Sequence, residues 1–325
     1  MTTYLVTGAA GFIASKVCEF LIGEGHEVVG IDNLNDAYDV RLKEWRLEQL
    51  QGKPEFRFHQ VDICSRDQLR DLFSSKFQAV INLAARAGVR QSLENPWVYF
   101  ETNLTGTLNL LELCREFDVN KFVLASTSSL YGASESVPFT EDAPTSEPLS
   151  PYAASKKGAE ALCHSYHYLY GIDITVLRYF TVYGPAGRPD MSLFRFVQWI
   201  SEGKDVMVFG DGQQSRDFTY VDDIARGTIK ALRPLGFETI NLGSDEPIVL
   251  LDAIRLIEEL VGKEAKLEFR PRHPADVMAT WADITKAVEL LEWAPEHDFK
   301  AGLEALVGWY QANRAWARQV ATQTS

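Results

Sequence analysis

The fold is decided near the start of the chain, where residues 4–14 read Tyr4-Leu-Val-Thr-Gly8-Ala-Ala-Gly11-Phe-Ile-Ala14. Tyr4–Thr7 predicts a buried strand, and the periodicity of Phe12–Glu24 predicts the helix that follows it. The two glycines permit a tight turn and let backbone amides approach a pyrophosphate, which the helix N-terminus also attracts. Ala14 takes the third glycine position of the pattern, a tolerated variant. A strand, a glycine-rich turn and a helix in this order are typical of an α/β fold that binds a dinucleotide.

Short apolar runs alternate with amphipathic stretches through the first half of the chain. This alternation predicts a Rossmann-like, doubly wound parallel sheet with helices on both faces. The predicted strands are Tyr4–Thr7, His26–Ile31, Glu55–Gln60, Ala79–Leu83, Lys121–Ala125 and Asp173–Arg178. The predicted helices are Phe12–Glu24, Asp67–Ser75, Pro96–Phe117 and Tyr152–Tyr170.

The strand–helix rhythm breaks after Arg178, which indicates a second, smaller domain on the C-terminal side. Phe218–Leu232 and the strand Thr239–Leu242 return to the sheet, so we expect this domain to be discontinuous in sequence. The amphipathic helices Ile248–Val261 and Ile284–Leu291 belong to it. The expected division gives residues 1–178 and 215–243 to a cofactor domain, and residues 179–214 and 244–325 to a substrate domain.

The composition is that of an ordinary soluble globular protein, with 46% hydrophobic and 24% charged residues. The net charge of −13 argues against nucleic acid and acidic membranes as partners. The apolar runs are shorter than the ~20 residues of a membrane span. A strand beginning at Tyr4 leaves no room for a signal peptide, and the four cysteines show no paired spacing, so we expect a cytoplasmic protein. Cys163, His164 and His167 have the spacing of helix packing, and we predict no metal site.

A candidate catalytic pair lies in Tyr152-Ala-Ala-Ser-Lys156, the one place where a tyrosine is followed by a lysine four residues later. Residues with this spacing share one face of a helix. A free phenol ionises near pH 10, and a neighbouring cation lowers its pKa so that it can act as a base. A hydroxyl from the upstream segment Thr127-Ser-Ser-Leu-Tyr-Gly132 can relay the proton. A surface pair on a helix is the plainer interpretation of the same spacing.

The acidic residue at the end of the second predicted strand indicates which dinucleotide is bound. Asp32 would accept the hydroxyls of an adenosine ribose and repel a 2′-phosphate, and no basic residue follows it until Arg41. We therefore expect NAD rather than NADP. Asp62 and Ile63 would flank the adenine, although Asp62 could equally cap a helix. Asn103 is expected to reach the nicotinamide half.

These segments resemble the extended short-chain dehydrogenase/reductase superfamily, and within it the nucleotide-sugar epimerases. The resemblance runs almost from end to end. The segment Gly210–Asp222 is typical of enzymes that act on nucleotide-diphosphate sugars. The matching segments are Thr7–Ala14, Asn82–Ala85, Ala125–Gly132, Tyr152–Lys156, Arg178–Gly184, Gly210–Asp223 and Ala282–Asp283.

Two segments are most similar to the UDP-glucuronate 4-epimerases, namely Arg178–Met191 and Asn35–Lys43. The resemblance therefore implies reversible C4 epimerisation of UDP-glucuronate to UDP-galacturonate. UDP-glucose or UDP-N-acetylglucosamine 4-epimerisation is the alternative. A UDP-glucuronate decarboxylase ranks lower, because Ser129 stands where that enzyme carries an acidic residue. A non-catalytic NAD-binding protein also ranks lower, because Thr127, Tyr152 and Lys156 are all present.

The resemblance also implies a role for each matching residue. Tyr152 is the base that takes the C4 hydroxyl proton while NAD takes the hydride, and Lys156 lowers the phenol pKa and binds the nicotinamide ribose. Thr127 supplies the bridging hydroxyl. The cofactor-binding residues are Gly8, Gly11, Phe12, Ile13, Asp32, Asn33, Asp62, Ile63, Leu83, Ala84, Ala85, Asn103, Tyr152, Lys156 and Tyr179. The UDP-sugar-binding residues are Arg90, Thr127, Ser128, Ser129, Thr181, Arg188, Phe209, Arg216, Arg272 and Thr280.

The chain departs from the family pattern at two places. Asn82 replaces a usual histidine, and His273 replaces an expected arginine, with Arg272 one position earlier. The family also implies a homodimer, which would pair the helices Pro96–Phe117 and Tyr152–Tyr170 of two subunits.

Overall fold

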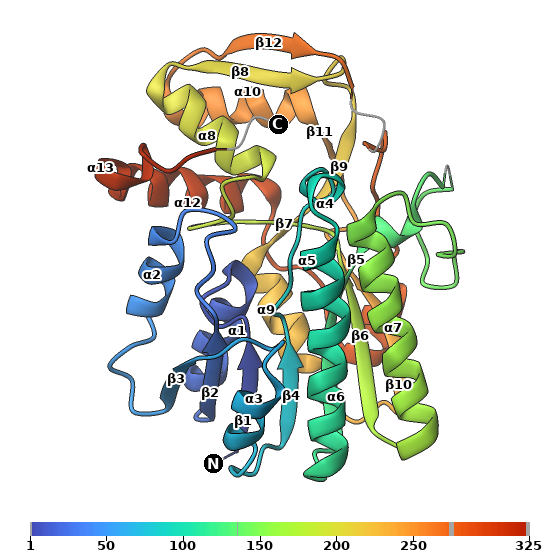
Figure 1. The fold of residues 1–325 in the computed structure, drawn as a ribbon. Helices are drawn as coiled ribbons and strands as arrows, with labels where there is room; N and C mark the ends of the chain where they lie inside the picture. The colour runs from blue at the N-terminus through green and yellow to red at the C-terminus, as the bar shows by residue number, and fades with distance from the viewer. Residues whose placement is uncertain (1, 135, 273–275, 323–325) are drawn as a thin grey trace.

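A computed structural model describes residues 2–134, 136–272 and 276–322, and its centre is a seven-stranded parallel sheet (Figure 1). The strand order is β10-β6-β5-β4-β1-β2-β3, and each neighbouring pair is parallel. The strands are β1 (Thr3–Thr7), β2 (Glu27–Asp32), β3 (Phe56–Gln60), β4 (Ala79–Asn82), β5 (Lys121–Thr127), β6 (Asp173–Tyr179) and β10 (Phe237–Leu242). The sequence-based prediction of a doubly wound sheet is confirmed.

Helices cover both faces of the sheet (Figure 1). On one face, α1 packs against α2 and α9, and on the other α6 packs against α3 and α7. Strand residues alternate between the two: Val6 and Val123 belong to the first core, and Leu5 and Leu124 to the second. The helices are α1 (Phe12–Gly23), α2 (Arg41–Glu48), α9 (Val221–Lys230), α3 (Arg66–Leu72), α6 (Gly106–Glu116) and α7 (Pro151–Tyr170). None of the described helices is long and apolar enough to cross a membrane.

The predicted helix Pro96–Phe117 is divided by a π-helical turn. It consists of α5 (Trp97–Phe100), the π turn η1 (Glu101–Thr105) and α6. Inside that turn, the Asn103 side chain accepts from the Arg86 N–H and donates to the Arg86 carbonyl, both at 2.9 Å. Such turns re-aim a side chain toward a site, and apolar periodicity does not reveal them.

A smaller unit lies at the carboxyl end of the sheet, in the upper part of Figure 1. Its strands form a three-stranded sheet, β11-β9-β7, and a separate parallel pair, β8 and β12. Its strands are β7 (Thr181–Tyr183), β8 (Asp205–Phe209), β9 (Ser215–Tyr220), β11 (Pro247–Val249) and β12 (Lys266–Arg270). Its helices are α8 (Ser192–Glu202), α10 (Leu250–Val261), α12 (Phe299–Ala312) and α13 (Arg314–Ala317).

Two predictions about this half of the chain are corrected. Residues 248 and 249 belong to β11 rather than to a helix, because Ile248 pairs with Arg216 of β9. The helix α11 (Thr285–Leu291) contacts β10 and α9, so it packs beside the large sheet and not within the smaller unit.

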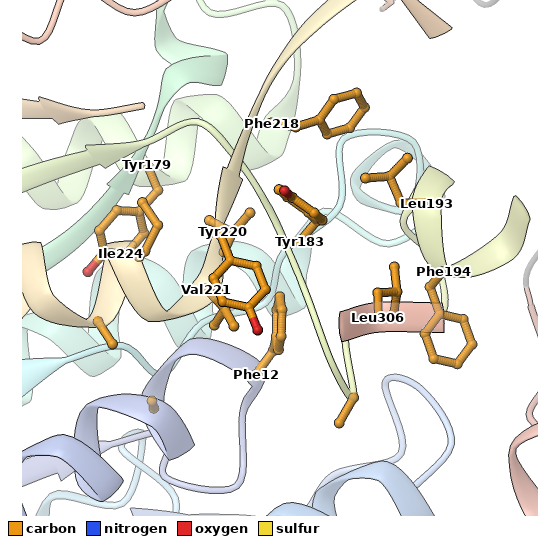
Figure 2. Packing of buried hydrophobic residues seen from close by; sticks show 14 of the residues in the cluster. Phe12, Tyr179, Tyr183, Leu193, Phe194, Phe218, Tyr220, Val221, Ile224 and Leu306 are labelled. Atoms are coloured by element: carbon orange, nitrogen blue, oxygen red, sulfur yellow. The ribbon is translucent and has the colours of Figure 1, made fainter. Parts of the chain in front are cut away.

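Aromatic side chains from both units share one hydrophobic core. Figure 2 shows Phe12 beside Val221 and Tyr220, with Tyr183 and Phe218 of the smaller unit close by. The Tyr183 ring lies 5.8 Å from the Tyr220 ring. Because this core is continuous, the smaller unit is held rigidly above the carboxyl edge of the sheet.

Candidate active site

A cavity of about 570 Å³ lies at the carboxyl ends of β1, β2, β4, β5 and β6, where doubly wound folds bind their ligands. Two short helices lie beside its rim, α4 (Gln91–Glu94) and the 3₁₀ turn η2 (Ser128–Tyr131). Of the predicted cofactor residues, the cavity is lined by Gly8, Gly11, Phe12, Ile13, Asp32, Asn33, Asp62, Ile63, Leu83, Ala84, Ala85, Tyr152, Lys156 and Tyr179.

The glycine-rich turn lies too close to neighbouring backbone for any other residue. Gly8 has a φ of 71°, and a Cβ there would lie 2.9 Å from the backbone of Ala84. A Cβ on Gly11 would lie 2.7 Å from the Gly8 carbonyl oxygen. Such a bare backbone surface at the start of α1 fits a pyrophosphate.

The neighbouring Asn82, one of the two family departures, fastens this turn to the sheet. Its Oδ1 accepts from the Thr7 hydroxyl at 2.8 Å, and its Nδ2 donates to the Thr107 hydroxyl at 3.0 Å. The same Thr7 oxygen accepts from the Leu83 and Ala84 N–H groups. An amide at position 82 therefore satisfies both neighbours.

The adenosine end of the cavity holds a cation that the sequence analysis missed. Lys43 is buried on α2, and its Nζ lies 3.4 Å from Asp32 Oδ1 and 3.2 Å from Asn35 Oδ1. The sequence analysis noted no basic residue near Asp32, yet the chain turns back after Leu34 and brings Lys43 in. Asp32 still presents a carboxylate to the cavity, as NAD binding requires.

The candidate catalytic pair, Tyr152 and Lys156, is held by the start of α7 and by β5. Ser150 caps α7 by accepting from the Ala153 N–H, and this places Tyr152 in the first turn. The Tyr152 phenol lies close to the Thr127 hydroxyl, at the end of β5, and this hydroxyl acts to lower the phenol pKa. The Lys156 ammonium donates to the Ala125 carbonyl at 2.9 Å. The structure thus brings Thr127, Tyr152 and Lys156 together as predicted.

The electrostatics of the pair differ from the simple expectation. Burial raises the pKa of the Tyr152 phenol above its ordinary value, although Thr127 and Arg188 both act to lower it. Burial also lowers the pKa of Lys156 to about 8, against the opposing charge of Glu160. In the protein alone, desolvation therefore dominates the pKa of the phenol. The lowering of this pKa by Lys156 stays a prediction.

Short hydroxyls and one guanidinium line the part of the cavity next to Tyr152. They are Thr127, Ser128, Ser129, Thr181 and Arg188, all predicted as substrate-binding residues. The Thr127 hydroxyl accepts from the Ser129 N–H at 3.1 Å, so this oxygen also caps η2. The turn-forming and ligand-binding interpretations of these hydroxyls are therefore compatible.

Arg188 is oriented by an acidic neighbour that the sequence analysis did not single out. Its Nε donates to Asp190 Oδ1 at 3.1 Å and its Nη2 donates to the Ala87 carbonyl at 3.2 Å. Within the described residues these contacts engage Nε and Nη2, which leaves Nη1 as the edge that can receive a carboxylate.

One predicted cofactor residue, Asn103, does not line the cavity. It is buried, and it holds the Arg86 backbone from behind while donating to the Ser155 hydroxyl at 2.9 Å. Asn103 thus shapes the wall of the cavity instead of touching its contents. Sequence analysis predicted the helix that carries Asn103 but not the direction of its side chain.

The residues predicted to hold the UDP half lie outside this cavity. Arg90 stacks on the Phe209 ring at 4.1 Å and pairs with Asp276 at 2.6 Å, so these three residues do come together. The charges of Asp276 and Arg90 both act on the pKa of Arg216, so Arg216 lies near this group. Its Nη1 donates to the Ser215 carbonyl at 2.7 Å.

Two further residues that were predicted to bind the substrate, Thr280 and Arg272, lie apart from this group. Thr280 is buried, and its hydroxyl accepts from the Asp217 N–H at 3.1 Å, so it closes a strand contact instead of facing a ligand. Arg272 is exposed beside Gly210. Position 273, where a histidine replaces the expected arginine, lies outside the described residues.

Sequence analysis missed further residues that line the cavity, both in loops and within the predicted helix Pro96–Phe117. Tyr38, Arg86, Tyr99 and Asp190 line the cavity from loops and short helices. A signal existed for Tyr38 and Lys43, since both lie in the family-like segment 35–43. In the described part of the chain no group of three His, Cys, Asp or Glu residues could hold a metal ion.

Comparison with known proteins identifies the family. The pattern of the NAD dependent epimerase/dehydratase family matches residues 4–243. The chain belongs to this family. The resemblance drawn from the sequence is confirmed, and the match includes the whole seven-stranded sheet.

Members of the family with closely similar sequences and structures extend the comparison. The UDP-glucuronate 4-epimerase of Thermodesulfobacterium geofontis is 59% identical over 96% of this chain and 97% of its own. The crystal structure of the Bacillus cereus UDP-glucuronic acid 4-epimerase with UDP-glucuronic acid and NAD matches with a TM-score of 0.91 and 40% identity, covering 96% of this chain and all of that chain. The UDP-glucose 4-epimerase of Thermotoga maritima with UDP-glucose matches with a TM-score of 0.90 and 32% identity, covering 96% and 100%.

Proposed function

We propose that this protein interconverts UDP-glucuronate and UDP-galacturonate by inverting C4, with NAD held throughout. The observation that carries this proposal is the similarity to the T. geofontis and B. cereus UDP-glucuronate 4-epimerases along nearly the whole chain. The assembled Thr127, Tyr152 and Lys156 supply the required chemistry. The bare backbone at Gly8 and Gly11 and the Asp32 carboxylate fit NAD.

Tyr152 takes the proton of the C4 hydroxyl and returns it at the end of the cycle. NAD, when bound, accepts the C4 hydride and later gives it back. Because the Tyr152 phenol is buried and its pKa is raised in the protein alone, its proton is lost only when positive charge is close. Lys156 and Arg188 line the same cavity, and they are the cations that we assign to this role. Thr127 holds the phenolic oxygen and can pass the proton to the sugar hydroxyl.

The 4-keto sugar must turn over between the two hydride transfers, so the diphosphate has to be held more firmly than the ring. Arg90 and Arg216, which gather beside Phe209 and Asp276, are the proposed diphosphate ligands. Their distance from the catalytic cavity suits a site that anchors one end of the substrate and leaves the other free.

The uronate adds a hazard, because a 4-keto uronate is a β-keto acid that can lose carbon dioxide. Decarboxylation needs the C5–carboxylate bond to stand perpendicular to the ketone plane. We assign Arg188, Ser129 and Thr181 to holding the carboxylate away from that orientation, since all three line the cavity near Tyr152. Asp190 offsets part of the charge of Arg188 and fixes the orientation of its guanidinium.

The experiment that tests the function is an NMR time course of the purified protein with UDP-glucuronate. UDP-galacturonate should appear without added NAD, and a Tyr152→Phe variant should retain NAD but form no product. An unchanged spectrum with the unmodified protein would reject the proposal. The same assay with UDP-glucose and UDP-N-acetylglucosamine tests the alternative, which the similarity to the T. maritima enzyme supports.

We further propose a homodimer that pairs two segments of each subunit, the α5–η1–α6 segment and the helix α7. The most exposed large apolar side chains there are Trp97 at 81%, Tyr168 at 80% and Leu169 at 63%. α6 and α7 lie side by side and offer a continuous face to a second copy (Figure 1). Light scattering should give the mass of two chains. Leu169→Glu should halve that mass, whereas Leu267→Glu on β12 should leave it unchanged.

The domain division proposed from the sequence is retained with its function attached. Residues 1–178 and 215–243 form the NAD-binding domain, and residues 179–214 and 244–325 form the UDP-sugar-binding domain. The return of β10 to the large sheet supports this division, although β9 pairs with β7 and β11 and α11 packs beside the large sheet. A cytoplasmic location is supported by the four cysteines, all of which are free.

A further inference from the structure

A buried arginine that the mechanism does not use joins two loops of the active site. Arg46 lies on α2 with only 3% of its surface exposed. Its Nη1 donates to the Ala10 carbonyl at 3.1 Å, in the glycine-rich turn. Its Nε and Nη2 both donate to the Ala186 carbonyl, at 3.0 and 2.6 Å, in the loop that carries Arg188.

The charge of Arg46 is satisfied in an unusual way. Among the described residues, no carboxylate lies within salt-bridge distance of its guanidinium. The acceptors are backbone carbonyls and the Tyr38 hydroxyl, which accepts from Nη1 at 2.7 Å. The guanidinium also lies 5.8 Å from the Phe12 ring and 5.5 Å from the Tyr38 ring. A buried cation without a carboxylate is costly, so its contacts must be specific.

The loop that accepts hydrogen bonds from Arg46 contains a strained backbone. Ala186 has a φ of 52°, in the left-handed region that a residue with a Cβ adopts only with strain. Strain of this kind costs on the order of 1–3 kcal/mol and persists only where the surroundings fix it. Gly187 packs close to the Phe12 ring, since a Cβ there would lie 3.7 Å from it. Arg188 follows directly.

We propose that Arg46 is a positioning residue that fixes Arg188 relative to the cofactor turn and thereby keeps the 4-keto uronate from losing carbon dioxide. This inference rests on the proposed function. Arg46 connects the turn at Ala10, where the pyrophosphate would lie, to the loop at Ala186. Arg188 follows two residues later in this loop and would face the sugar. When the tie is lost, the loop relaxes and the carboxylate gains freedom to reach the reactive orientation.

The side reaction balances without any further reagent. The C5–carboxylate bond breaks, its electron pair forms the enolate across C5 and C4, and carbon dioxide leaves. Water then protonates C5 to give a UDP-4-keto-pentose. When this 4-keto-pentose leaves before the hydride returns to its C4, one NADH remains for each carbon dioxide released.

The test is the ratio of carbon dioxide released to UDP-galacturonate formed, measured by NMR with carboxyl-labelled UDP-glucuronate. Arg46→Lys keeps the positive charge but removes the planar guanidinium that bonds both the Ala10 and the Ala186 carbonyls. The ratio should then rise about tenfold or more, because a misplacement of about 1 Å costs up to ~100-fold in such sites. NADH absorbance should rise in parallel. Arg57→Lys, on the exposed end of β3, is the matched control and should leave the ratio at the wild-type value.

A ratio unchanged in Arg46→Lys, with slower turnover alone, would show that Arg46 only supports the fold and would overturn the inference. Should Arg46→Lys fail to fold, Tyr38→Phe decides, since it removes one acceptor of Arg46 and should raise the ratio by a smaller factor. An unchanged ratio there would equally overturn it. Failure of the wild-type protein to make UDP-galacturonate would instead reject the proposed function, so the two failures are distinct.

Discussion

The Ser126 hydroxyl donates a hydrogen bond to the Glu160 carboxylate at 2.7 Å, one residue along β5 from the carbonyl that holds Lys156. The next residue, Thr127, lies close to the Tyr152 phenol, the proposed base. Three consecutive residues of one strand therefore fasten three residues of one face of α7. Any shift of the helix against the strand would disturb the proton acceptor, the cation and the counter-charge together.

The pH dependence should follow the charge of Lys156. Burial lowers its pKa to about 8, so the ammonium is present below that pH and lost above it. We expect the rate of epimerisation to fall as the pH rises through about 8, because the charged lysine favours the phenolate. A pH–rate profile with saturating substrate measures this. A rate that stays flat to about pH 10, the ordinary range for lysine, would contradict it.

The same pKa has a consequence for stability. A lysine whose pKa is lowered by folding binds fewer protons in the folded than in the unfolded state at pH values between about 8 and 10.5. Its contribution to the free energy of unfolding therefore rises with pH across that window. Lys156→Met should lack this component, and urea unfolding at several pH values compares the two proteins.

Glu160→Gln should destabilise the fold strongly. The Glu160 carboxylate accepts from Arg178 Nε and Nη2, both at 3.0 Å, and both side chains are buried. Breaking such a pair leaves an uncompensated charge and costs about 3–5 kcal/mol. Urea unfolding measures the loss. Glu112→Gln, at the edge of α6, is the control, and equal effects in the two variants would refute the burial argument.

Gly8→Ala should lose bound NAD. The new Cβ would lie 2.9 Å from the Ala84 backbone, and alanine resists the φ of 71°. The NAD content of the purified protein should fall to a small fraction of the wild-type value. Gly23 lies at the end of α1, and a Cβ there would have no neighbouring atom within 4 Å. The Gly23→Ala protein should therefore keep its NAD. Retention of NAD by Gly8→Ala would show that the glycine-rich turn does not bind the pyrophosphate.

Asp32→Asn should admit NADP. The change removes the carboxylate that repels a 2′-phosphate and frees Lys43, now 3.4 Å from it, to meet that phosphate. We expect the affinity for NADP relative to NAD to rise about tenfold, or about 1.4 kcal/mol. Calorimetry with cofactor-free protein measures the two affinities, and Asp36→Asn on the exposed loop is the control. No change in the ratio would show that Lys43 is otherwise engaged.

The elements that the sequence predicted well are those with a strong local signal. The strands of the sheet and α7 were placed to within a residue or two, because buried strands and a capped helix follow from local pattern. The cavity-lining set around Gly8, Asp32 and Tyr152 followed from motif positions. Gly8 and Asp32 lie at the ends of β1 and β2, and Tyr152 lies in the first turn of α7, so their neighbours in space are fixed once the strand order and this helix are known.

The failures arose where the direction of a side chain depends on distant contacts. Asn103 was placed on the right helix, but a π-helical turn aims it at the Arg86 backbone. Thr280 faces Asp217 because the chain crosses β9 there. Lys43 reaches Asp32 only because α2 folds back over the cofactor turn. None of these contacts leaves a trace in periodicity or spacing.

The chain passes between the large sheet and the smaller unit several times, at β6 to β7, at β9 to α9 and at β10 to β11. The smaller unit is thus assembled from separate stretches and has no single pair of cut points. Exchanging it for that of a relative would require several simultaneous splices through a shared aromatic core. A change of sugar preference in this lineage is consequently reached more easily by replacing single residues around the cavity than by recombining modules.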